Sequence, residues 1–430
     1  MTSSTGSPST RRAGGEVRRD PRRRAAARRS DNPKWTVTMN PSAHPATRAA
    51  RAGTHTPPGA APPLVPALHQ STVHAYPDLA SLHRVLDDEE RGQVYYRFGH
   101  YNGQVLEEAV ADLEGAADAV SAASGMAALT GTVLALVEAG GHVVADRNAY
   151  GGTRSLLEVD LPRLGITTTL VDAADPGDVE RALTPRTGLL LVEALTNPTM
   201  RVPDLPALAA LAAAAGATFV VDSTFATPAL IRPLDHGADL VWHSIPKYLG
   251  GHSAAMGGIV AGDAGLVARI RRSIVHVGAT LGPFDAWLAL LGLKTLPLRM
   301  RAHTRGATAV AEFLATHPAV TRVHHPAHPG HPHAATAARL YPGGTGGMLS
   351  FELAGGRRAV DELIRRLGPA IPLSPSLADV ATTLVHPATT THRSLAPEDL
   401  AVLGITDGLV RLSVGIEEPA DLVAELGAAL

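Results

Sequence analysis

Residues 217–251 read ATFVVDSTFATPALIRPLDHGADLVWHSIPKYLGG, and this stretch contains two short apolar runs, at 218–221 and 240–242. Asp222 directly follows the first run, and Lys247 comes shortly after the second. Apolar runs of this length are typical of strands that are buried on both faces, as in a parallel sheet. Because parallel strands end at the same edge of a sheet, where ligands bind, we expect Asp222 and Lys247 to lie together at that edge.

The same pattern continues on both sides of this stretch. Segments rich in Ala and Leu, such as 205–215, separate further apolar runs at 143–145, 169–171 and 189–192. Strands that alternate with helices build βαβ units. The chain from about 104 to 258 is therefore predicted to have an α/β fold, with a mainly parallel sheet and helices on both of its faces.

The pattern changes toward the C-terminus. A Leu-rich segment at 287–298 is followed by a loop interrupted by Pro and His, and then by two predicted strand–helix units. The first unit covers 347–353 and 360–367, and the second covers 410–414 and 419–430. Alternation of this kind in a short segment predicts a smaller C-terminal α+β domain.

Composition divides the chain into four predicted parts. Residues 1–66 lack apolar periodicity and are rich in Arg, Pro, Ala, Gly and Thr, which favours a disordered or extended chain. We expect the strongly basic first part to be solvated rather than bound to nucleic acid or anionic lipid, and Met39 is an alternative start. The four parts are a basic disordered tail (1–38), an extended N-terminal segment (39–103), a large cofactor-binding domain (104–290) and the C-terminal α+β domain (291–430).

The composition also excludes several classes of protein. The absence of cysteine removes disulfide-stapled folds and thiolate metal sites. The 38 basic and 40 acidic residues nearly cancel, unlike the charge of a protein that carries nucleic acid on its surface. No stretch approaches the roughly 20 apolar residues of a membrane span. We therefore expect a soluble cytoplasmic protein that binds neither nucleic acid nor membrane.

Lysine is rare in this chain, and its rarity draws attention to Lys247. Only Lys34, Lys247 and Lys294 occur among the 38 basic residues. An amine can form a Schiff base, which a guanidinium cannot. A carboxylate such as Asp222, placed beside the pyridine nitrogen of pyridoxal 5′-phosphate (PLP), keeps that nitrogen protonated and makes the ring an electron sink. The pair of Lys247 and Asp222 therefore indicates PLP as the cofactor.

Two further segments fit the same cofactor. Ser124-Gly125-Met126 precedes a predicted helix at 127–138, where free backbone N–H groups and the helix dipole attract a phosphate. Tyr150 precedes the flexible pair Gly151-Gly152 and offers an aromatic face for stacking. Each signal is weak alone, since Ser-Gly often only turns the chain and a single Tyr is usually packing, but the combination in this order is specific.

Seven motifs occur along the chain in a fixed order: Leu113-Glu114-Gly115, Ser124-Gly125-Met126-Ala127-Ala128, Tyr150-Gly151-Gly152-Thr153, Asn197-Pro198, Asp222-Ser223-Thr224-Phe225-Ala226-Thr227-Pro228, His243-Ser244-Ile245-Pro246-Lys247-Tyr248-Leu249-Gly250-Gly251-His252-Ser253 and Arg411-Leu412-Ser413-Val414-Gly415. With them, the chain from about Thr47 onward resembles the trans-sulfuration, or Cys/Met-metabolism, enzymes of PLP fold type I. The resemblance covers nearly everything after Met39.

The resemblance implies a role for each of these residues. Lys247 would form the internal aldimine and move protons between Cα, C4′ and Cβ, Asp222 would hold the pyridinium, and Tyr150 would stack on the ring and assist the leaving group. Cofactor-binding residues implied in the same chain are Gly125, Met126, Ser244 and Thr224, and those implied from the neighbouring subunit are Tyr95 and Arg97. The implied substrate-binding residues are Arg411, which would clamp the carboxylate, and its helpers Ser376 and Asn197.

The same resemblance implies an assembly of identical subunits. It predicts a homodimer at least and favours a homotetramer, in which residues 39–103 form an arm between subunits. The partners expected are therefore other copies of the chain and a small amino-acid substrate.

Four departures from the family pattern bear on substrate choice. Pro246 replaces a threonine whose hydroxyl binds phosphate, and His100-Tyr101-Asn102 replaces Asn-Pro-Thr beside the substrate entrance. Ala381 replaces a glutamate that recognises or excludes substrate amines, and Gly152 stands where methionine γ-lyases carry a cysteine. Typical methionine γ-lyase activity is therefore not favoured.

The predicted activity is a PLP-dependent γ- or β-elimination or replacement on an amino acid such as cystathionine or an O-acylhomoserine, through a Cα carbanion and a vinylglycine-type intermediate. Two alternatives stay open: a member of specialised metabolism that acts on a γ-halogenated or unsaturated amino acid, and a PLP-binding partner protein without catalysis. Five histidines at 324–333 are interrupted by Pro and Gly, and we predict no metal site there.

Overall fold

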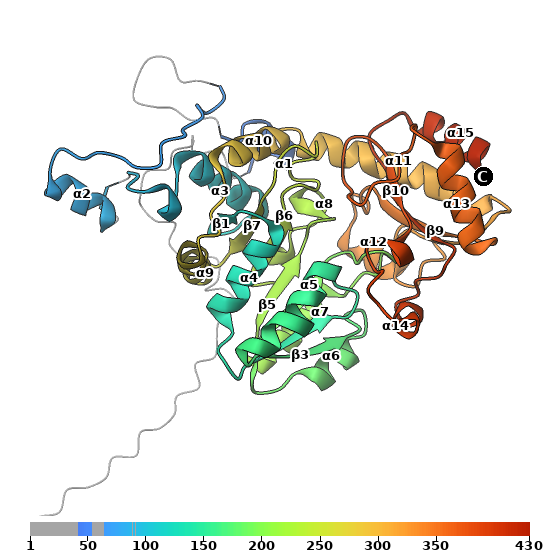
Figure 1. Cartoon of the computed structure of the whole chain (residues 1–430), viewed down its shortest axis with the longest axis horizontal. Coiled ribbons are helices and arrows are strands. Elements are labelled where there is room, and N and C mark those ends of the chain that lie inside the picture. The colour runs from blue at the N-terminus through green and yellow to red at the C-terminus, as the bar shows by residue number, and fades with distance from the viewer. Residues whose placement is uncertain (1–41, 54–63, 88, 91) are drawn as a thin grey trace, which may run out of the picture. The chain divides into compact units, whose positions relative to one another are not determined.

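The computed structural model describes residues 42–53, 64–87, 89–90 and 92–430 (Figure 1). Its α-helices are α1 (Pro45–Ala50), α2 (Leu79–Leu86), α3 (Tyr101–Glu114), α4 (Gly125–Leu136), α5 (Gly151–Ser155), α6 (Pro176–Ala182), α7 (Leu205–Ala215), α8 (Thr227–Leu230), α9 (Ala264–Val277), α10 (Pro283–Leu293), α11 (Leu296–Thr316), α12 (Ala334–Leu340), α13 (Gly356–Leu367), α14 (Pro397–Val402) and α15 (Pro419–Ala429).

A seven-stranded sheet has the order β1-β7-β6-β5-β4-β2-β3. Its strands are β1 (Asp118–Ala122), β2 (His142–Asp146), β3 (Thr167–Val171), β4 (Thr187–Glu193), β5 (Thr218–Asp222), β6 (Leu240–Ser244) and β7 (Gly258–Gly262). The pairs from β6 through β5, β4 and β2 to β3 are parallel, whereas β7 pairs antiparallel with both β6 and β1. The predicted mainly parallel sheet is confirmed.

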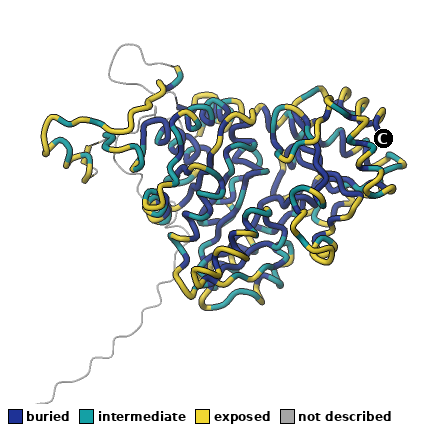
Figure 2. The backbone as a smooth tube through the Cα atoms, viewed as in Figure 1, coloured by how far each residue is buried: buried dark blue, intermediate teal, exposed yellow. Residues whose placement is uncertain are grey.

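Helices cover both faces of this sheet. Successive residues of a strand point to opposite faces, so the apolar strands present side chains to a layer of helices on each side. On one face, Val221 and Val241 pack with buried residues of α3, α7 and α10. On the other face, Val220 and Leu240 pack with buried residues of α4 and α9. Figure 2 shows the resulting pattern, in which the central strands β4, β5 and β6 are largely buried and the outer sides of the helices are exposed.

A second, smaller sheet has the order β10-β11-β9-β8 and is antiparallel throughout. Its strands are β8 (Val320–His324), β9 (Met348–Leu353), β10 (Thr383–Val385) and β11 (Leu409–Ser413). Their apolar side chains form one core with α11, α13 and α15. The predicted α+β unit near the C-terminus is therefore confirmed as a fold, with the strand–helix pairs β9–α13 and β11–α15 where they were expected.

The N-terminal region differs from the sequence-based expectation. We expected residues 1–66 to lack regular structure, yet Pro45–Ala50 forms a helix. Its cause is tertiary, because Ala49 is fully buried and the Arg48 guanidinium forms an ion pair with Asp112 of α3 (3.1 Å). Local periodicity does not reveal such a helix. The predicted basic tail, 1–38, lies outside the described residues.

The domain limits remain a prediction. The large sheet lies within 118–262 and the small one within 320–413, while the predicted boundary at 290 falls inside α10. Of the helices in the described part of the chain, none combines the length and the apolar character that crossing a membrane requires.

Candidate active site

Lys247 lies in a tight turn directly after β6. The Gly251 amide donates to the Lys247 carbonyl (2.7 Å) and has a φ of +71°, which favours glycine. A Cβ at Gly251 would also collide with the guanidinium of Arg299. That guanidinium is buried and donates to the carbonyls of the turn, including that of Tyr248 (2.8 Å). The turn is therefore held both by its own backbone and by Arg299, which fixes Lys247 at the carboxyl edge of the sheet.

The Lys247 amine contacts Ser376, which lies in the segment between α13 and β10 of the smaller sheet. Its Nζ donates a hydrogen bond to Ser376 Oγ (2.9 Å), although 129 residues separate the two. Burial, helped by the positive charge of Arg411, lowers the pKa of Lys247 to about 8. A sizeable fraction of the amine is therefore neutral and nucleophilic near neutral pH.

Asp222, Thr224 and Ser244 form a second group at the same edge. Asp222 is the last residue of β5, and its carboxylate accepts a hydrogen bond from the Thr224 amide (2.9 Å). Thr224 Oγ1 in turn accepts from the Ser244 amide at the end of β6 (2.9 Å). Burial raises the pKa of Asp222. The hydrogen bonds from Thr224, and then the electrostatic interaction with the nearby His243, act against this rise. A cation next to Asp222 would therefore favour the ionised form of this carboxyl.

The N-terminus of α4 faces this group. Ser124 caps the helix, since its Oγ accepts a hydrogen bond from the Ala127 amide (3.0 Å). A Cβ added to Gly125 would lie 3.0 Å from both Cβ and Oγ of Ser244. Glycine at 125 thus lets β6 approach the first turn of the helix, and the amides of Gly125 and Met126 lie at the positive end of the helix dipole.

Tyr150 begins α5 and leaves its ring partly open, with 48% of the residue exposed. A Cβ at Gly152 would lie 2.6 Å from Cε1 of that ring and 3.3 Å from Sδ of Met126. The ring therefore occupies the space that a side chain at position 152 would need. This gives a physical reason for glycine at position 152, where the resemblance places a cysteine in methionine γ-lyases.

Arg411 joins the two sheets. It lies in the middle of β11, is 2% exposed, and donates from Nη1 to Asn197 Oδ1 (3.0 Å) and from Nη2 to the Ser376 carbonyl (3.1 Å). Burial lowers its pKa to about 10, so the group stays cationic near neutral pH. Lys247, Ser376, Arg411 and Asn197 thus form one connected cluster, and the guanidinium keeps further N–H groups for a carboxylate.

Comparison with known proteins gives the family. The model of the family described as Cys/Met metabolism PLP-dependent enzyme matches residues 46–430. The chain belongs to this family. The activity is therefore a PLP-dependent elimination or replacement of trans-sulfuration chemistry, and the structure adopts PLP fold type I.

Individual relatives are similar over most of their length. The chain is 42% identical over 387 residues to cystathionine gamma-synthase of Mycobacterium tuberculosis strain H37Rv, covering 90% of this chain and 96% of that protein. It is 41% identical over 342 residues to O-succinylhomoserine sulfhydrylase of Pseudomonas aeruginosa, covering 80% and 84%. The crystal structure of cystathionine gamma synthase from Xanthomonas oryzae superposes with a TM-score of 0.84 at 38% identity, covering 90% and 97%.

The residues of this Cys/Met-metabolism enzyme fit its PLP cofactor. A buried amine with a lowered pKa, a carboxyl with a raised pKa and a partly open aromatic ring surround one edge of the sheet. Ser244 approaches Gly125 so closely that a Cβ there would lie 3.0 Å from Ser244 Oγ, which places the first turn of α4 beside the end of β6. The donor set therefore provides an amine, an acid, a stacking face and a phosphate cradle.

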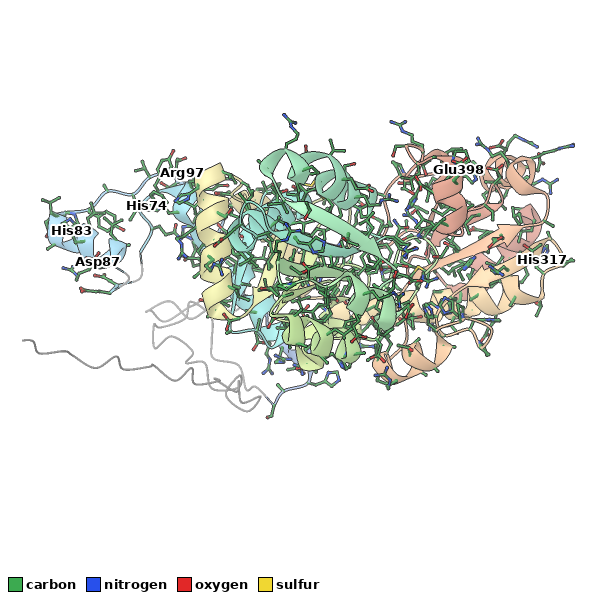
Figure 3. All side chains as sticks on the ribbon, turned by 90° about the horizontal axis from the view of Figure 1, so that it is seen from below. His74, His83, Asp87, Arg97, His317 and Glu398 are labelled. Atoms are coloured by element: carbon green, nitrogen blue, oxygen red, sulfur yellow. The ribbon has the colours of Figure 1, made fainter. Side chains whose placement is uncertain are left out.

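Tyr95 and Arg97 lie elsewhere in the chain. Arg97 donates to the carbonyl of Val275 at the end of α9 (3.0 Å), and its guanidinium lies over the ring of Phe98 (4.8 Å). Figure 3 places Arg97 on the side of the molecule that carries His74 and His83, away from His317 and Glu398. Within one chain, these contacts connect Arg97 to α9 and not to the cluster around Lys247, and the ring of Tyr95 meets that of Phe98 (6.0 Å).

His100 has a structural position. Its Nδ1 accepts from the Gly103 amide (3.1 Å) as the N-cap of α3, its ring stacks on Tyr96, and only 3% of it is exposed. Asn102 donates to the Ala67 carbonyl (2.9 Å). The two polar residues of this departure from the family pattern thus anchor the chain around α3.

Sequence reasoning missed two buried groups near the cluster. Glu193 ends β4 and contacts the backbone of Tyr150 and Asn197, a position that resembles that of Asp222 at the end of β5. The sequence signal that could have indicated Glu193 is an acidic residue directly after the apolar run at 189–192. His392 is 3% exposed. Burial is the main cause, and the positive charge of Arg411 the second, that lowers the pKa of His392 to about 4. No local pattern marks His392.

The histidines between the sheets bond to neighbouring groups. His324 pairs with Glu352 (2.9 Å), and His333 Nδ1 accepts from the Val202 amide (2.9 Å). The rings of His331 and His333 meet edge to face at 5.6 Å. Among the described residues, no three His, Asp or Glu side chains are grouped so that they could hold a metal ion.

Proposed function

We propose that this enzyme acts on an O-acylhomoserine and replaces its γ-acyloxy group with a sulfur nucleophile. The observation that carries this proposal is the cluster in which Lys247 Nζ contacts Ser376 and the Arg411 guanidinium contacts both Ser376 and Asn197. Two of the relatives described above are named for γ-replacement reactions. The missing carboxylate at Ala381 favours a small nucleophile, such as sulfide, that carries no amine of its own.

Residues of several elements would hold the cofactor. Gly125, Met126, Ser244 and Thr224 would bind its phosphate, Asp222 would bind the pyridine nitrogen, and Tyr150 would cover the ring. When bound, PLP withdraws electrons from the Cα of an attached amino acid. Burial raises the pKa values of Glu193 and Asp222, and a cationic ring bound beside them would favour their ionised forms.

The remaining steps belong to the chain's own groups. Arg411 would bind the substrate carboxylate through two parallel hydrogen bonds, with Asn197 and Ser376 holding the guanidinium in place. Lys247 would remove the proton from Cα and then serve as acid and base at neighbouring carbons. Loss of the γ-acyloxy group as a carboxylate leaves Cγ open to attack, by sulfide for replacement, while hydrolysis without such attack completes an elimination.

The test is a substrate panel with product analysis on the purified holoenzyme. O-succinylhomoserine and O-acetylhomoserine are each incubated with sulfide, with cysteine or alone, and cystathionine, methionine and a γ-halogenated amino acid are incubated alone. We expect homocysteine from an acylhomoserine with sulfide, and 2-oxobutanoate with ammonia when no nucleophile is added. Turnover of the γ-halogenated amino acid with none from either acylhomoserine would contradict the proposal.

A pH dependence follows from the burial of Lys247. The rate at which cofactor-free enzyme binds PLP covalently is expected to rise with pH through a midpoint near 8, because the neutral amine is the nucleophile. At pH 7.5 about a quarter of such an amine is neutral, against about 0.1% for an ordinary lysine. Stopped-flow absorbance measures this rate, and Nα-acetyllysine amide provides the solution reference. A midpoint near 10 for the enzyme would argue against a buried reactive amine.

We further propose that the active enzyme is a dimer or higher oligomer in which Tyr95 and Arg97 complete the phosphate site of a neighbouring subunit. This is supported by the 40% exposure of Tyr95 and by the contacts of Arg97 with α9 and not with the Lys247 cluster. Each site would then need residues from two copies of the chain.

Mixing two inactive variants tests this arrangement. Lys247→Ala and Arg97→Ala are expected to be inactive or weakly active separately, whereas co-refolded mixtures should regain activity. In a random dimer, about a quarter of all sites would combine an intact Lys247 with an intact Arg97 from the partner. The control is a mixture of Lys247→Ala with Lys247→Arg, which should stay inactive. A mixture of the first two variants that regains nothing would show that Arg97 does not act across subunits.

A further inference from the structure

Glu193 links two segments that are distant in the sequence. It is the last residue of β4 and is 8% exposed. One carboxylate oxygen, Oε1, accepts a hydrogen bond from the Tyr150 amide (2.7 Å), and the other, Oε2, accepts from the Asn197 amide (3.3 Å). A single buried side chain therefore holds the start of α5 and the loop after β4 at once.

The same carboxylate stands beside Asp222. In the parallel pair of β4 and β5, Glu193 is in register with Asp222, and the Ala194 amide donates to the Asp222 carbonyl (2.8 Å). Paired residues of neighbouring strands point to the same face of a sheet, so both acids face the side that is covered by α4. Burial, and then the nearby Asp222, raise the pKa of Glu193 well above its ordinary value.

The two backbone contacts lead to two different parts of the site. Through Tyr150, Glu193 connects to the partly open aromatic ring. Through Asn197, it connects to Arg411, because Asn197 Oδ1 accepts from the Arg411 guanidinium (3.0 Å). Loss of Glu193 would therefore allow the Tyr150 ring and the Asn197–Arg411 pair to shift relative to each other.

We propose that Glu193 is a positioning residue that sets the Tyr150 ring and the Asn197–Arg411 pair at a fixed spacing, so that a bound ring and the carboxylate of the attached amino acid are held in register. The inference rests on the roles proposed above for Tyr150 and Arg411. It assigns no contact between Glu193 and substrate. A rigid spacing matters because a misplacement of about 1 Å in a supporting residue can cost 10²-fold in rate.

The test uses holoenzyme and two readouts that a purely structural residue would leave unchanged. The first is the circular dichroism of the visible cofactor band, which reports the asymmetric surroundings of the ring. The second is the dissociation constant of L-alanine, measured from the spectral shift that it causes. L-alanine carries the amine and carboxylate but no γ-leaving group, so this probe does not depend on which substrate is turned over.

We expect Glu193→Ala to weaken L-alanine binding at least tenfold and to reduce the dichroism of the band by half or more. Glu193→Gln keeps one acceptor oxygen and the side-chain length, so it should lie between Glu193→Ala and the wild type. It also keeps the inference testable if the alanine variant does not fold. Glu107→Ala is the matched control, since Glu107 is a buried acid that accepts from the Ser121 amide (2.8 Å) and pairs with Arg271 (2.8 Å).

The control should lower the melting temperature while keeping both readouts at the wild-type values. If both Glu193 variants do the same, Glu193 only stabilises the fold and the inference is wrong. A Tyr150→Ala variant distinguishes a wrong inference about Glu193 from a failure of the proposed site. If Tyr150→Ala leaves the dichroism unchanged, or if the wild type shows no shift with L-alanine, the roles proposed above for Tyr150 and Arg411 are wrong instead.

Discussion

Replacement of Lys247 by alanine is expected to lower turnover by at least about 10⁴-fold, because one side chain provides both the covalent attachment of the cofactor and the acid–base group. The amine lies at the carboxyl edge of the sheet in a turn held by Arg299. The measurement is turnover on an acylhomoserine, together with mass spectrometry after borohydride reduction. Reduction should attach the cofactor to the wild type and not to the variant.

Lys294 provides the matched control for this experiment. It is the other lysine of the described part of the chain, and its amine donates to the Leu64 carbonyl (3.2 Å). Lys294→Ala should keep the borohydride adduct and the wild-type turnover. An adduct on the Lys247→Ala variant, or its loss from the Lys294→Ala variant, would show that the cofactor attaches elsewhere.

Replacement of Arg411 by lysine is expected to lower kcat/KM by about 10²-fold or more. A lysine keeps the charge but loses the planar fork that binds a carboxylate through two hydrogen bonds. It also leaves Asn197 Oδ1 and the Ser376 carbonyl without their donors (3.0 and 3.1 Å) in a buried site, which costs free energy. The effect should appear mainly in KM, because the guanidinium is expected to bind the carboxylate before any bond changes.

A ligand comparison tests whether the loss concerns the carboxylate. The wild type should bind L-alanine much more tightly than ethylamine, which lacks the carboxylate, and the Arg411→Lys variant should lose most of this preference. Arg365→Lys serves as the control, because the Arg365 side chain is 70% exposed on α13. An unchanged preference in the Arg411 variant would place the carboxylate contact on another residue.

Local pattern predicted some elements closely. The Ala- and Leu-rich segment at 205–215 became α7 with the expected bounds, and the apolar run at 218–221 became β5 with Asp222 at its end. As expected for such a run, β5 is buried on both faces, with Val221 in one core and Val220 in the other. The helix expected at 127–138 begins and ends two residues earlier, as α4, because Ser124 rather than a later residue provides its cap.

Other elements were not recognised because their order depends on distant partners. β7 contains three consecutive apolar residues between glycines, and it is ordered by antiparallel pairing with β6 and β1. β8 carries Arg322 and an exposed face, so its alternation is weak. The arginine and alanine content of α1 resembles that of the preceding tail, and only its burial against α3 and α11 distinguishes it.

By itself, the sequence determined the family, the parallel sheet and the placement of Lys247 and Asp222 at one edge, because these follow from short motifs and from the periodicity of neighbouring residues. The family resemblance implied that Arg411, Ser376 and Asn197 act together. Only the tertiary structure decided which atoms bond, namely Lys247 to Ser376, Arg411 to Asn197, and Glu193 to the amides of both Tyr150 and Asn197. These residues lie up to 214 positions apart. Contacts over such separations are set by how the two sheets and their helices pack, and no local spacing encodes them.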